Sequence, residues 1–181
     1  DVRWPFNEVH MRRFKDILCV VEPGHECTLS LRRAVELAEN NQSNLTVTAV
    51  APSVTAGIGI PEGGPISKEL QTASVNNFHK TLEQLVEPYR QRINIETKVL
   101  IGIPFLEITR EVIRNTHDLV IKCPESLDWL DHYFSSDDKH LLRKCPCPVW
   151  MVRPKNGESF DRVLAAVDVS VDGSPDESKT R

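Results

Sequence analysis

The sequence predicts an α/β fold built on a parallel β-sheet with helices packed on both of its faces. Apolar runs of strand length alternate with helix-length amphipathic segments five times along the chain. The strand-like runs are continuously apolar, which is typical of strands buried on both faces. A chain of 181 residues is long enough for one complete domain and too short for two.

The first half of the chain begins with the apolar run Lys15–Glu22, which predicts a buried strand that ends at a Pro-Gly pair. Thr28 is expected to cap a helix that runs to about Asn40, and Leu45–Val50 is rich in valine and threonine, as strands are. Ser67 is expected to cap a long second helix that ends near Pro88. The apolar positions of that helix are Leu70, Phe78, Leu82, Leu85 and Val86.

The second half repeats the alternation with shorter elements. Ile93–Ile101, His117–Cys123 and Val149–Val152 are the third, fourth and fifth predicted strands. A short amphipathic helix between the third and fourth strands carries its apolar face on Phe105, Ile108, Val112 and Ile113. Asp137–Lys144 is the last helix, with acidic residues at its positive end and basic residues at its negative end. Crossovers between parallel strands are right-handed, so a ligand is expected at the carboxyl ends of the strands, where the strand order reverses.

An internal repeat indicates a second domain. The pattern of Phe14–Glu22 recurs at Phe160–Asp168: a phenylalanine, two charged residues, five small or apolar residues and a carboxylate. Residues 11–154 are therefore expected to form one domain, 155–159 a linker, and 160–181 the first strand and start of another domain. Residues 1–10 are expected to be a tag or disordered, because His10-Met11 is the dipeptide that a common cloning site leaves.

Composition argues against several classes of protein. The 22 basic and 26 acidic residues give no field of one sign, so neither nucleic acid nor a membrane surface is expected as a partner. The apolar runs are too short to span a bilayer, and no secretory signal is visible. The five cysteines are an odd number, and Cys19 and Cys123 lie inside apolar strands, where cysteine acts as a small hydrophobe. A reducing, cytoplasmic location is therefore expected.

Three short sequences together suggest a family. They are Ile101-Gly102-Ile103-Pro104, His117-Asp118-Leu119-Val120 and Cys145-Pro146-Cys147-Pro148-Val149. In this order and spacing the chain resembles the universal stress protein family over Arg13–Pro154, and the likeness restarts at Phe160. His140–Val152 is especially similar to the first domain of E-type tandem members. The resemblance implies a three-layer α/β/α fold with a five-stranded parallel sheet of order 3-2-1-4-5, Rossmann-like and similar to the adenine nucleotide alpha hydrolases. It also implies a homodimer or a tandem pseudo-dimer joined through the last strands.

Some members of that family bind ATP, and the resemblance places a candidate ATP site at the carboxyl edge of the sheet. An acidic residue at the end of the first strand would meet the ribose or a metal, and a glycine-rich loop after the fourth strand would hold the phosphates. The candidate site residues are Glu22, Val50, Gly102, Pro104, Ser135 and Ser136. The stretch from Cys123 to Phe134 contains no glycine and carries bulky and acidic side chains, so the amide cradle for phosphate is missing. The site is therefore expected to be degenerate, with no cofactor in this domain, and ATP binding remains the alternative.

Other motifs are assigned no chemistry. Gly57–Gly64 is not a dinucleotide fingerprint, because Glu62 stands where the third glycine belongs, and a mobile surface loop is expected. His140 with the Cys145-Pro-Cys147 pair is too tightly spaced for a zinc site. No residue set marks a catalytic site. The apolar stripe Leu127, Leu130 and Phe134, flanked by Trp129 and Tyr133, favours packing onto the sheet over a pocket for a small apolar ligand or a partner.

These observations favour a non-catalytic stress-response protein that binds or regulates, with a degenerate ATP site. The alternative is an ATP-binding switch with slow hydrolysis. A third hypothesis, a hydrolase acting at the nucleotide α-phosphate, requires a phosphate loop after the first strand. Pro23–Cys27 supplies only one glycine for such a loop, so this hypothesis ranks last.

Overall fold

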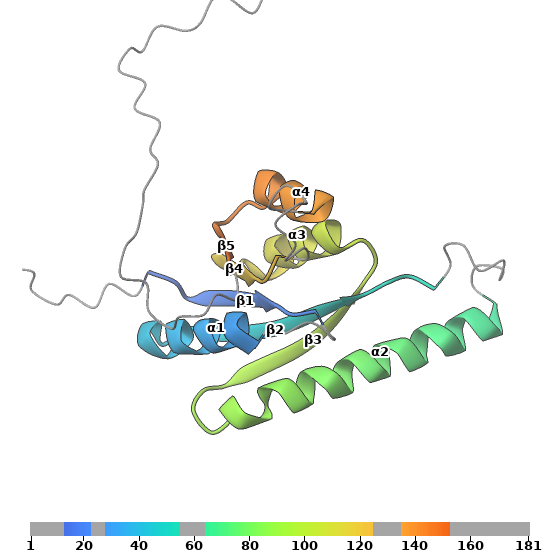
Figure 1. Ribbon diagram of the computed structural model, residues 1–181, viewed down its shortest axis with the longest axis horizontal. Coiled ribbons are helices and arrows are strands. Elements are labelled where there is room, and N and C mark those ends of the chain that lie inside the picture. The colour runs from blue at the N-terminus through green and yellow to red at the C-terminus, as the bar shows by residue number, and fades with distance from the viewer. Residues whose placement is uncertain (1–12, 23–27, 55–63, 125–134, 153–181) are drawn as a thin grey trace, which may run out of the picture.

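The computed structural model describes residues 13–22, 28–54, 64–124 and 135–152. Strands and helices alternate through the described residues, with a short 3-10 turn before the third strand (Figure 1). In chain order the elements are β1 (Asp16–Val20), α1 (Thr28–Asn41), β2 (Asn44–Ala51), α2 (Pro65–Val86), η1 (Glu87–Tyr89), β3 (Ile95–Ile101), α3 (Pro104–Asn115), β4 (Leu119–Lys122), α4 (Ser136–Lys144) and β5 (Val149–Met151).

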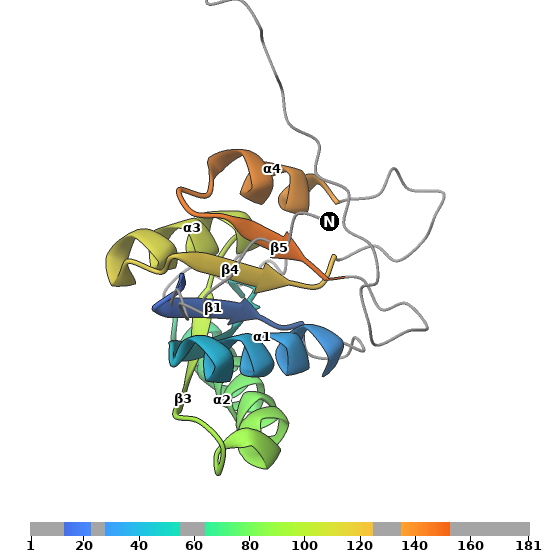
Figure 2. The ribbon, with the colours of Figure 1, turned by 90° about the vertical axis from the view of Figure 1, so that its left-hand side faces the viewer.

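The five strands form one sheet of order β3-β2-β1-β4-β5, and every neighbouring pair is parallel. Figure 2 shows β1, β4 and β5 side by side and pointing the same way. This confirms the fold class and the strand order. The order reverses between β1 and β4, which pair from Ile17 opposite Leu119 to Val20 opposite Lys122. The switch point of the fold therefore lies where these two strands end.

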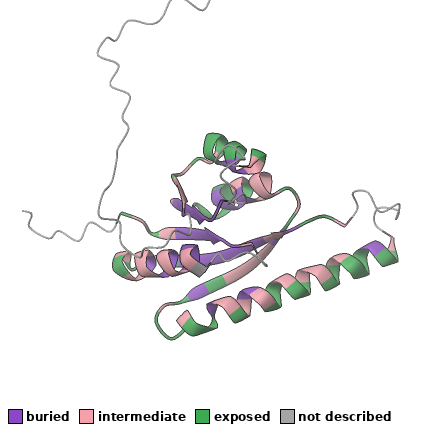
Figure 3. Ribbon diagram, in the orientation of Figure 1, coloured by how far each residue is buried: buried purple, intermediate pink, exposed green. Residues whose placement is uncertain are grey.

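Helices cover both faces of the sheet, in three layers. In Figure 1, α1 and α2 lie on one face, and α3 and α4 lie on the other. Alternate residues of β1 feed the two cores: Ile17 and Cys19 pack with the α1 and α2 side, and Leu18 and Val20 pack with the α3 and α4 side. Among the described residues, β1, β2 and β4 are the most continuously buried, and they are largely purple in Figure 3.

Two details of the helices differ from the sequence-based expectation. Gly64, not Ser67, is the N-cap of α2, and the buried Ser67 hydroxyl donates to the Gly64 carbonyl oxygen at 2.9 Å. Pro65 fixes the first helical position, which shifts the start of the helix towards the N-terminus. Leu70 and Ile113, expected on apolar faces, are 44% and 62% exposed.

Leu70 is exposed because α2 is longer than the part of it that packs against the sheet. Of its apolar residues only Leu82 and Val86 are buried, both in its C-terminal half. Ile113 follows the buried Val112 and points one step farther round α3, away from the sheet.

Several expectations fall outside the described residues. They are the residues 1–10, the loop of Gly57–Gly64 up to residue 63, the stripe at 127–134, the linker at 155–159 and the second-domain start at 160–181. Within the described ranges, no helix combines the length and the apolar character that crossing a bilayer requires.

Candidate functional site

The six candidate site residues all lie at the carboxyl edge of the sheet. Glu22 follows β1, Val50 is near the end of β2, Gly102 follows β3 and Pro104 opens α3. The other two belong to the start of α4, where Ser135 is the N-cap and Ser136 the first helical residue. The sequence therefore placed these residues at one edge.

One of the six, Glu22, contacts Lys122, the last residue of β4, and Lys122 also contacts Asp138 of α4. The Lys122 Nζ lies 2.7 Å from Glu22 Oε1 and 2.9 Å from Asp138 Oδ1, and it also donates to the Cys123 carbonyl oxygen at 3.3 Å. The side chains of Lys122 and Asp138 are 3% and 0% exposed, while that of Glu22 is 28% exposed.

The fold explains why these groups meet. Lys122 of β4 is the register partner of Val20, the last residue of β1. Val20 is two residues before Glu22, so Lys122 lies beside the carboxyl end of β1, close to Glu22. Val120 faces the α3 and α4 core, and side chains two apart on a strand share a face, so Lys122 faces α4 as well. Asp138 comes from the first turn of α4 and completes the cluster from above the sheet.

The electrostatics of the cluster favour a charged lysine. Burial by itself lowers the pKa of the Lys122 ammonium, but the charges of Glu22 and Asp138 and their hydrogen bonds outweigh burial. The pKa of Lys122 is therefore raised above its ordinary value. One ammonium group and two carboxylates leave the cluster with a formal charge of −1.

The N-terminus of α4 also points into this region, and side chains of α4 itself cap it and carry negative charge there. The Ser135 hydroxyl accepts a hydrogen bond from the Asp138 backbone N–H at 3.0 Å, which is an N-cap. Asp137 and Asp138 occupy the first turn, where the helix dipole stabilises negative charge. The helix end that could receive a phosphate group therefore already carries two carboxylates.

Gly102 and Pro104 shape the neighbouring part of the edge. Gly102 has a φ of +140°, which residues other than glycine rarely adopt, and its N–H donates to the Ala51 carbonyl oxygen at 3.0 Å. A Cβ at this position would lie 3.0 Å from Glu107 Cγ. Pro104 is the first helical residue of α3, and Val50 is half-buried against the α3 and α4 core.

The pair Cys145 and Cys147 lies just before β5, at the other end of α4. Their Sγ atoms are 3.6 Å apart. The hydrogen bond from Cys147 lowers the pKa of the Cys145 thiol to about 7, although burial acts in the opposite direction, and the same bond raises the pKa of Cys147. His140 stacks on Phe105 with ring centroids 4.9 Å apart. No group of three or more histidine, cysteine or acidic side chains in the described part of the chain is arranged to hold a metal ion.

Sequence reasoning missed the two residues that organise the edge. A lysine inside the apolar run Leu119–Cys123 was the available signal, because a buried ammonium group requires carboxylate partners. Asp138 was recognised only as a charge at a helix start. The partner positions are 100 and 16 residues away from Lys122 in the sequence, so only the fold could identify them.

Together, the doubly wound parallel sheet and the polar cluster at its switch point define an α/β protein of the nucleotide-binding fold. The family model described as Universal stress protein family matches residues 13–153. The chain belongs to the universal stress protein family.

Relatives of known name agree. The chain is 31% identical over 167 residues to Universal stress protein E of Photorhabdus laumondii, a match that covers 88% of this chain and 52% of that relative. It therefore spans about half the length of the Universal stress protein E relatives that it matches.

Among solved structures, the universal stress protein UspA of Lactobacillus plantarum superposes with a TM-score of 0.67 at 21% identity, covering 78% of this chain and 99% of that one. A universal stress protein solved in complex with cAMP superposes with a TM-score of 0.58 at 11% identity, covering 77% and 97%. At these identities the two structures establish the fold alone.

Proposed function

We propose that this domain is a non-catalytic stress-response module that binds or regulates through its surfaces, with an ATP site that is degenerate. The observation that carries the proposal is the ion cluster of Lys122, Glu22 and Asp138 at the switch point. In this fold the switch point is where a nucleotide would enter. Here the same place holds a lysine that two carboxylates already neutralise.

The cluster opposes a phosphate in two ways. Its formal charge is −1, so it repels an anion that approaches the edge. Releasing Lys122 to meet a phosphate would break its ion pair with Asp138, which is fully buried. Breaking a buried pair in this way costs about 3–5 kcal/mol. That cost corresponds to a loss of about two to four orders of magnitude in affinity.

The chain's own sequence supports the same conclusion. No glycine occurs between Cys123 and Phe134, although glycine is the residue type whose backbone a phosphate can approach most closely. The first turn of α4 adds Asp137 and Asp138 at the remaining amide donors. We assign the domain no cofactor and no catalytic residue.

We also propose how the domain is assembled. β5 is the last strand of the described sheet, and its free edge offers backbone groups to another strand. Pairing through this edge would create a homodimer or, in a protein as long as the matched relatives, a tandem pseudo-dimer. We place this assembly in the cytoplasm, since the four described cysteines, Cys19, Cys123, Cys145 and Cys147, are not in a disulfide.

Calorimetric titration with Mg²⁺–ATP tests the degenerate site. The 181-residue chain is expected to give no binding heat at micromolar nucleotide. If a longer tandem protein binds ATP, deleting its second domain is expected to abolish that binding. Micromolar binding that persists in the 181-residue chain would refute the proposal.

The second candidate is an ATP-binding switch with slow hydrolysis. It is favoured by the 28% exposure of the Glu22 side chain, which keeps a carboxylate accessible at the end of β1, and by the cAMP held in the structurally similar protein. Native mass spectrometry of freshly purified protein distinguishes the two candidates. A switch retains a nucleotide and loses it in Glu22→Ala, whereas the degenerate site retains none in either protein.

A further inference from the structure

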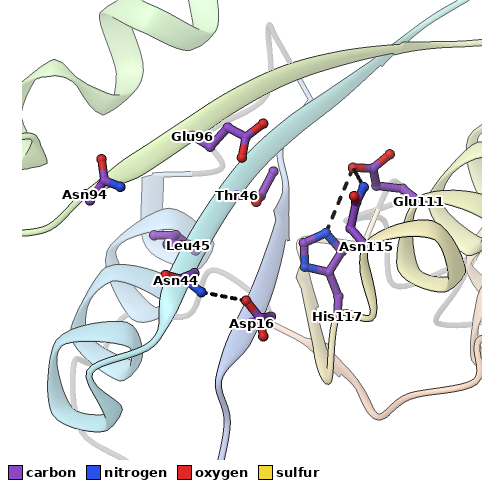
Figure 4. Close-up of a pocket in the computed structure, with 9 residues that line it drawn as sticks. All are labelled: Asp16, Asn44, Leu45, Thr46, Asn94, Glu96, Glu111, Asn115 and His117. Atoms are coloured by element: carbon purple, nitrogen blue, oxygen red, sulfur yellow. Dashed lines mark hydrogen bonds and ion pairs between the residues drawn. The ribbon is translucent and has the colours of Figure 1, made fainter.

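A polar hollow lies at the opposite edge of the sheet, between the amino-terminal ends of the strands and the end of α3. It has a volume of about 200 Å³. Asp16, Thr46 and Glu96 line it from β1, β2 and β3, and Glu111, Asn115 and His117 line it from α3 and the turn that follows (Figure 4). The hollow is separated from the Lys122 cluster by the length of the strands, because the two lie at opposite strand ends.

His117 is the unusual member of this group. Its side chain is 5% exposed, and neither ring nitrogen has a hydrogen-bond partner among the described residues. The nearest charged atom, Glu111 Oε1, is 3.9 Å from His117 Nε2, beyond hydrogen-bond distance. A buried polar group left in this state costs about 1–3 kcal/mol, so its retention calls for an explanation.

The backbone holds the imidazole in this position. Thr116 ends α3 in the left-handed conformation, with a φ of 55°, and the His117 N–H donates to the Val112 carbonyl oxygen at 3.2 Å. Asp118, the next residue, accepts hydrogen bonds from the backbone N–H groups of Lys15 and Asp16. His117 is thus anchored on both sides and directed into the hollow by the chain path.

The hollow carries more negative than positive charge. Of its three carboxylates, Glu111 is paired with Lys98, whose Nζ lies 2.7 and 2.8 Å from its two oxygens. Asp16 accepts a hydrogen bond from the Asn44 side chain at 2.7 Å. Glu96 is exposed and has no side-chain partner among the described residues. Three carboxylates and one lysine leave a formal charge of −2, which attracts a cation.

The size and the groups available define the class of ligand. A volume of about 200 Å³ is smaller than the range of about 300–1,000 Å³ that holds drug-sized molecules. The lining includes two acceptor carboxylates, a hydroxyl, asparagine side chains and the His117 imidazole, whose two buried nitrogens have no partner among the described residues. The described acidic, histidine and cysteine side chains form no metal-binding group. A compact ligand rich in N–H donors fits these conditions.

We propose that this hollow binds a small organic cation, a compound with a primary ammonium or guanidinium head, whose N–H groups are shared between the His117 imidazole and the Asp16 and Glu96 carboxylates. Such a ligand supplies the hydrogen-bond partner that His117 lacks. It also neutralises the excess negative charge at the amino-terminal edge.

The test is an NMR titration of the 181-residue chain, with agmatine as the probe and the His117 ring signals as the readout. Agmatine at millimolar concentration is expected to shift these signals in a saturable way. The neutral analogue 1-pentanol, at the same concentration and ionic strength, is expected to leave them unchanged. No saturable shift with agmatine, or an equal shift with 1-pentanol, would overturn the proposal. An equal shift with Mg²⁺ alone would also overturn it, in favour of a metal site.

Matched variants locate the binding. Glu96→Gln is expected to weaken agmatine at least about tenfold, the equivalent of one lost charge-assisted hydrogen bond. Glu69→Gln, an equal charge change at an exposed position of α2, is expected to leave the affinity unchanged. Equal weakening by both variants would mean that agmatine responds only to overall charge, which contradicts a built site.

A third variant separates ligand binding from structure. His117→Phe removes two unpartnered nitrogens from a buried position, so it is expected to keep or raise the thermal midpoint of the unliganded protein. Agmatine is expected to raise the midpoint of the wild-type chain and not that of His117→Phe. Equal thermal stabilisation of both proteins would contradict the role given to His117.

Discussion

Replacing Lys122 with methionine is expected to destabilise the domain severely, although methionine is close to lysine in length and packs well. The wild-type Lys122 side chain is 3% exposed, and its ammonium group makes hydrogen bonds to Glu22, Asp138 and the Cys123 carbonyl oxygen. Methionine supplies none of these donors. Asp138, at 0% exposure, then loses its ion pair with Lys122 in the core, whereas Glu22, at 28% exposure, can turn to water.

The magnitude follows from the buried partner. Removing one member of a buried ion pair costs about 3–5 kcal/mol. Whole domains are stable by only about 5–15 kcal/mol, so the variant loses a large fraction of its stability. For a chain of this size, the loss corresponds to a fall of about 6–20 °C in the unfolding midpoint.

Urea unfolding followed by circular dichroism measures the difference, provided that the slope m is unchanged between the proteins. Lys139→Met, an exposed lysine of the same helix as Asp138, is the control and is expected to change the stability by less than about 0.5 kcal/mol. The double variant Lys122→Met with Asp138→Asn also removes the Asp138 carboxylate. It is expected to recover part of the lost free energy of unfolding, with a coupling energy of about 0.5–3 kcal/mol. A loss in Lys122→Met no larger than in Lys139→Met would refute the buried cluster.

Three further predictions concern other parts of the domain. Gly102→Ala is expected to cost about 1–3 kcal/mol in a urea melt, because its φ of +140° is strained for alanine and the new Cβ meets Glu107; an unchanged midpoint would contradict this. Asp118→Ala is expected to cost about 1–3 kcal/mol, since its carboxylate accepts from two backbone N–H groups at the start of β1, and full retention of stability would count against that role. The alkylation rate of Cys145 is expected to rise with pH around a midpoint of about 7, because the thiolate is the reactive form and is scarce below that pH. Cys147→Ala removes the stabilising hydrogen bond, so the midpoint, read by peptide mass mapping, moves up towards that of an ordinary thiol; an identical midpoint in both proteins would disprove the assignment.

The spacing of apolar residues in the sequence was enough to predict most of the fold. The strands and helices followed from apolar runs and their spacing, because burial on two faces and burial on one face leave different patterns in the sequence. The places where the pattern misled are explained by packing. Leu70 has the spacing of a core residue, but the part of α2 that carries it does not lie against the sheet, so it stays exposed. Ser67 has the chemistry of an N-cap, yet Pro65 had already fixed the start of the helix.

The candidate site was predictable only in part. The edge of the sheet followed from the topology of parallel strands, and so did the residues that end each strand. The pairing of Lys122 with Asp138 depends on how α4 packs over β4. No local sequence pattern indicates that packing. His117 was expected only as the first residue of a strand, because the loss of its hydrogen-bond partners is a property of the folded hollow and not of the sequence.

The most direct test of the proposal that the ATP site at the carboxyl edge of the sheet is degenerate is a two-dimensional amide NMR titration. The 181-residue chain is titrated with Mg²⁺–ATP, and sodium chloride at equal ionic strength is the reference. The backbone signals of Glu22, Lys122, Ser135 and Ser136 report on the edge itself. We expect these four signals to stay in place at millimolar nucleotide. Saturable shifts confined to them would contradict the conclusion that Lys122 and its two carboxylates close the site.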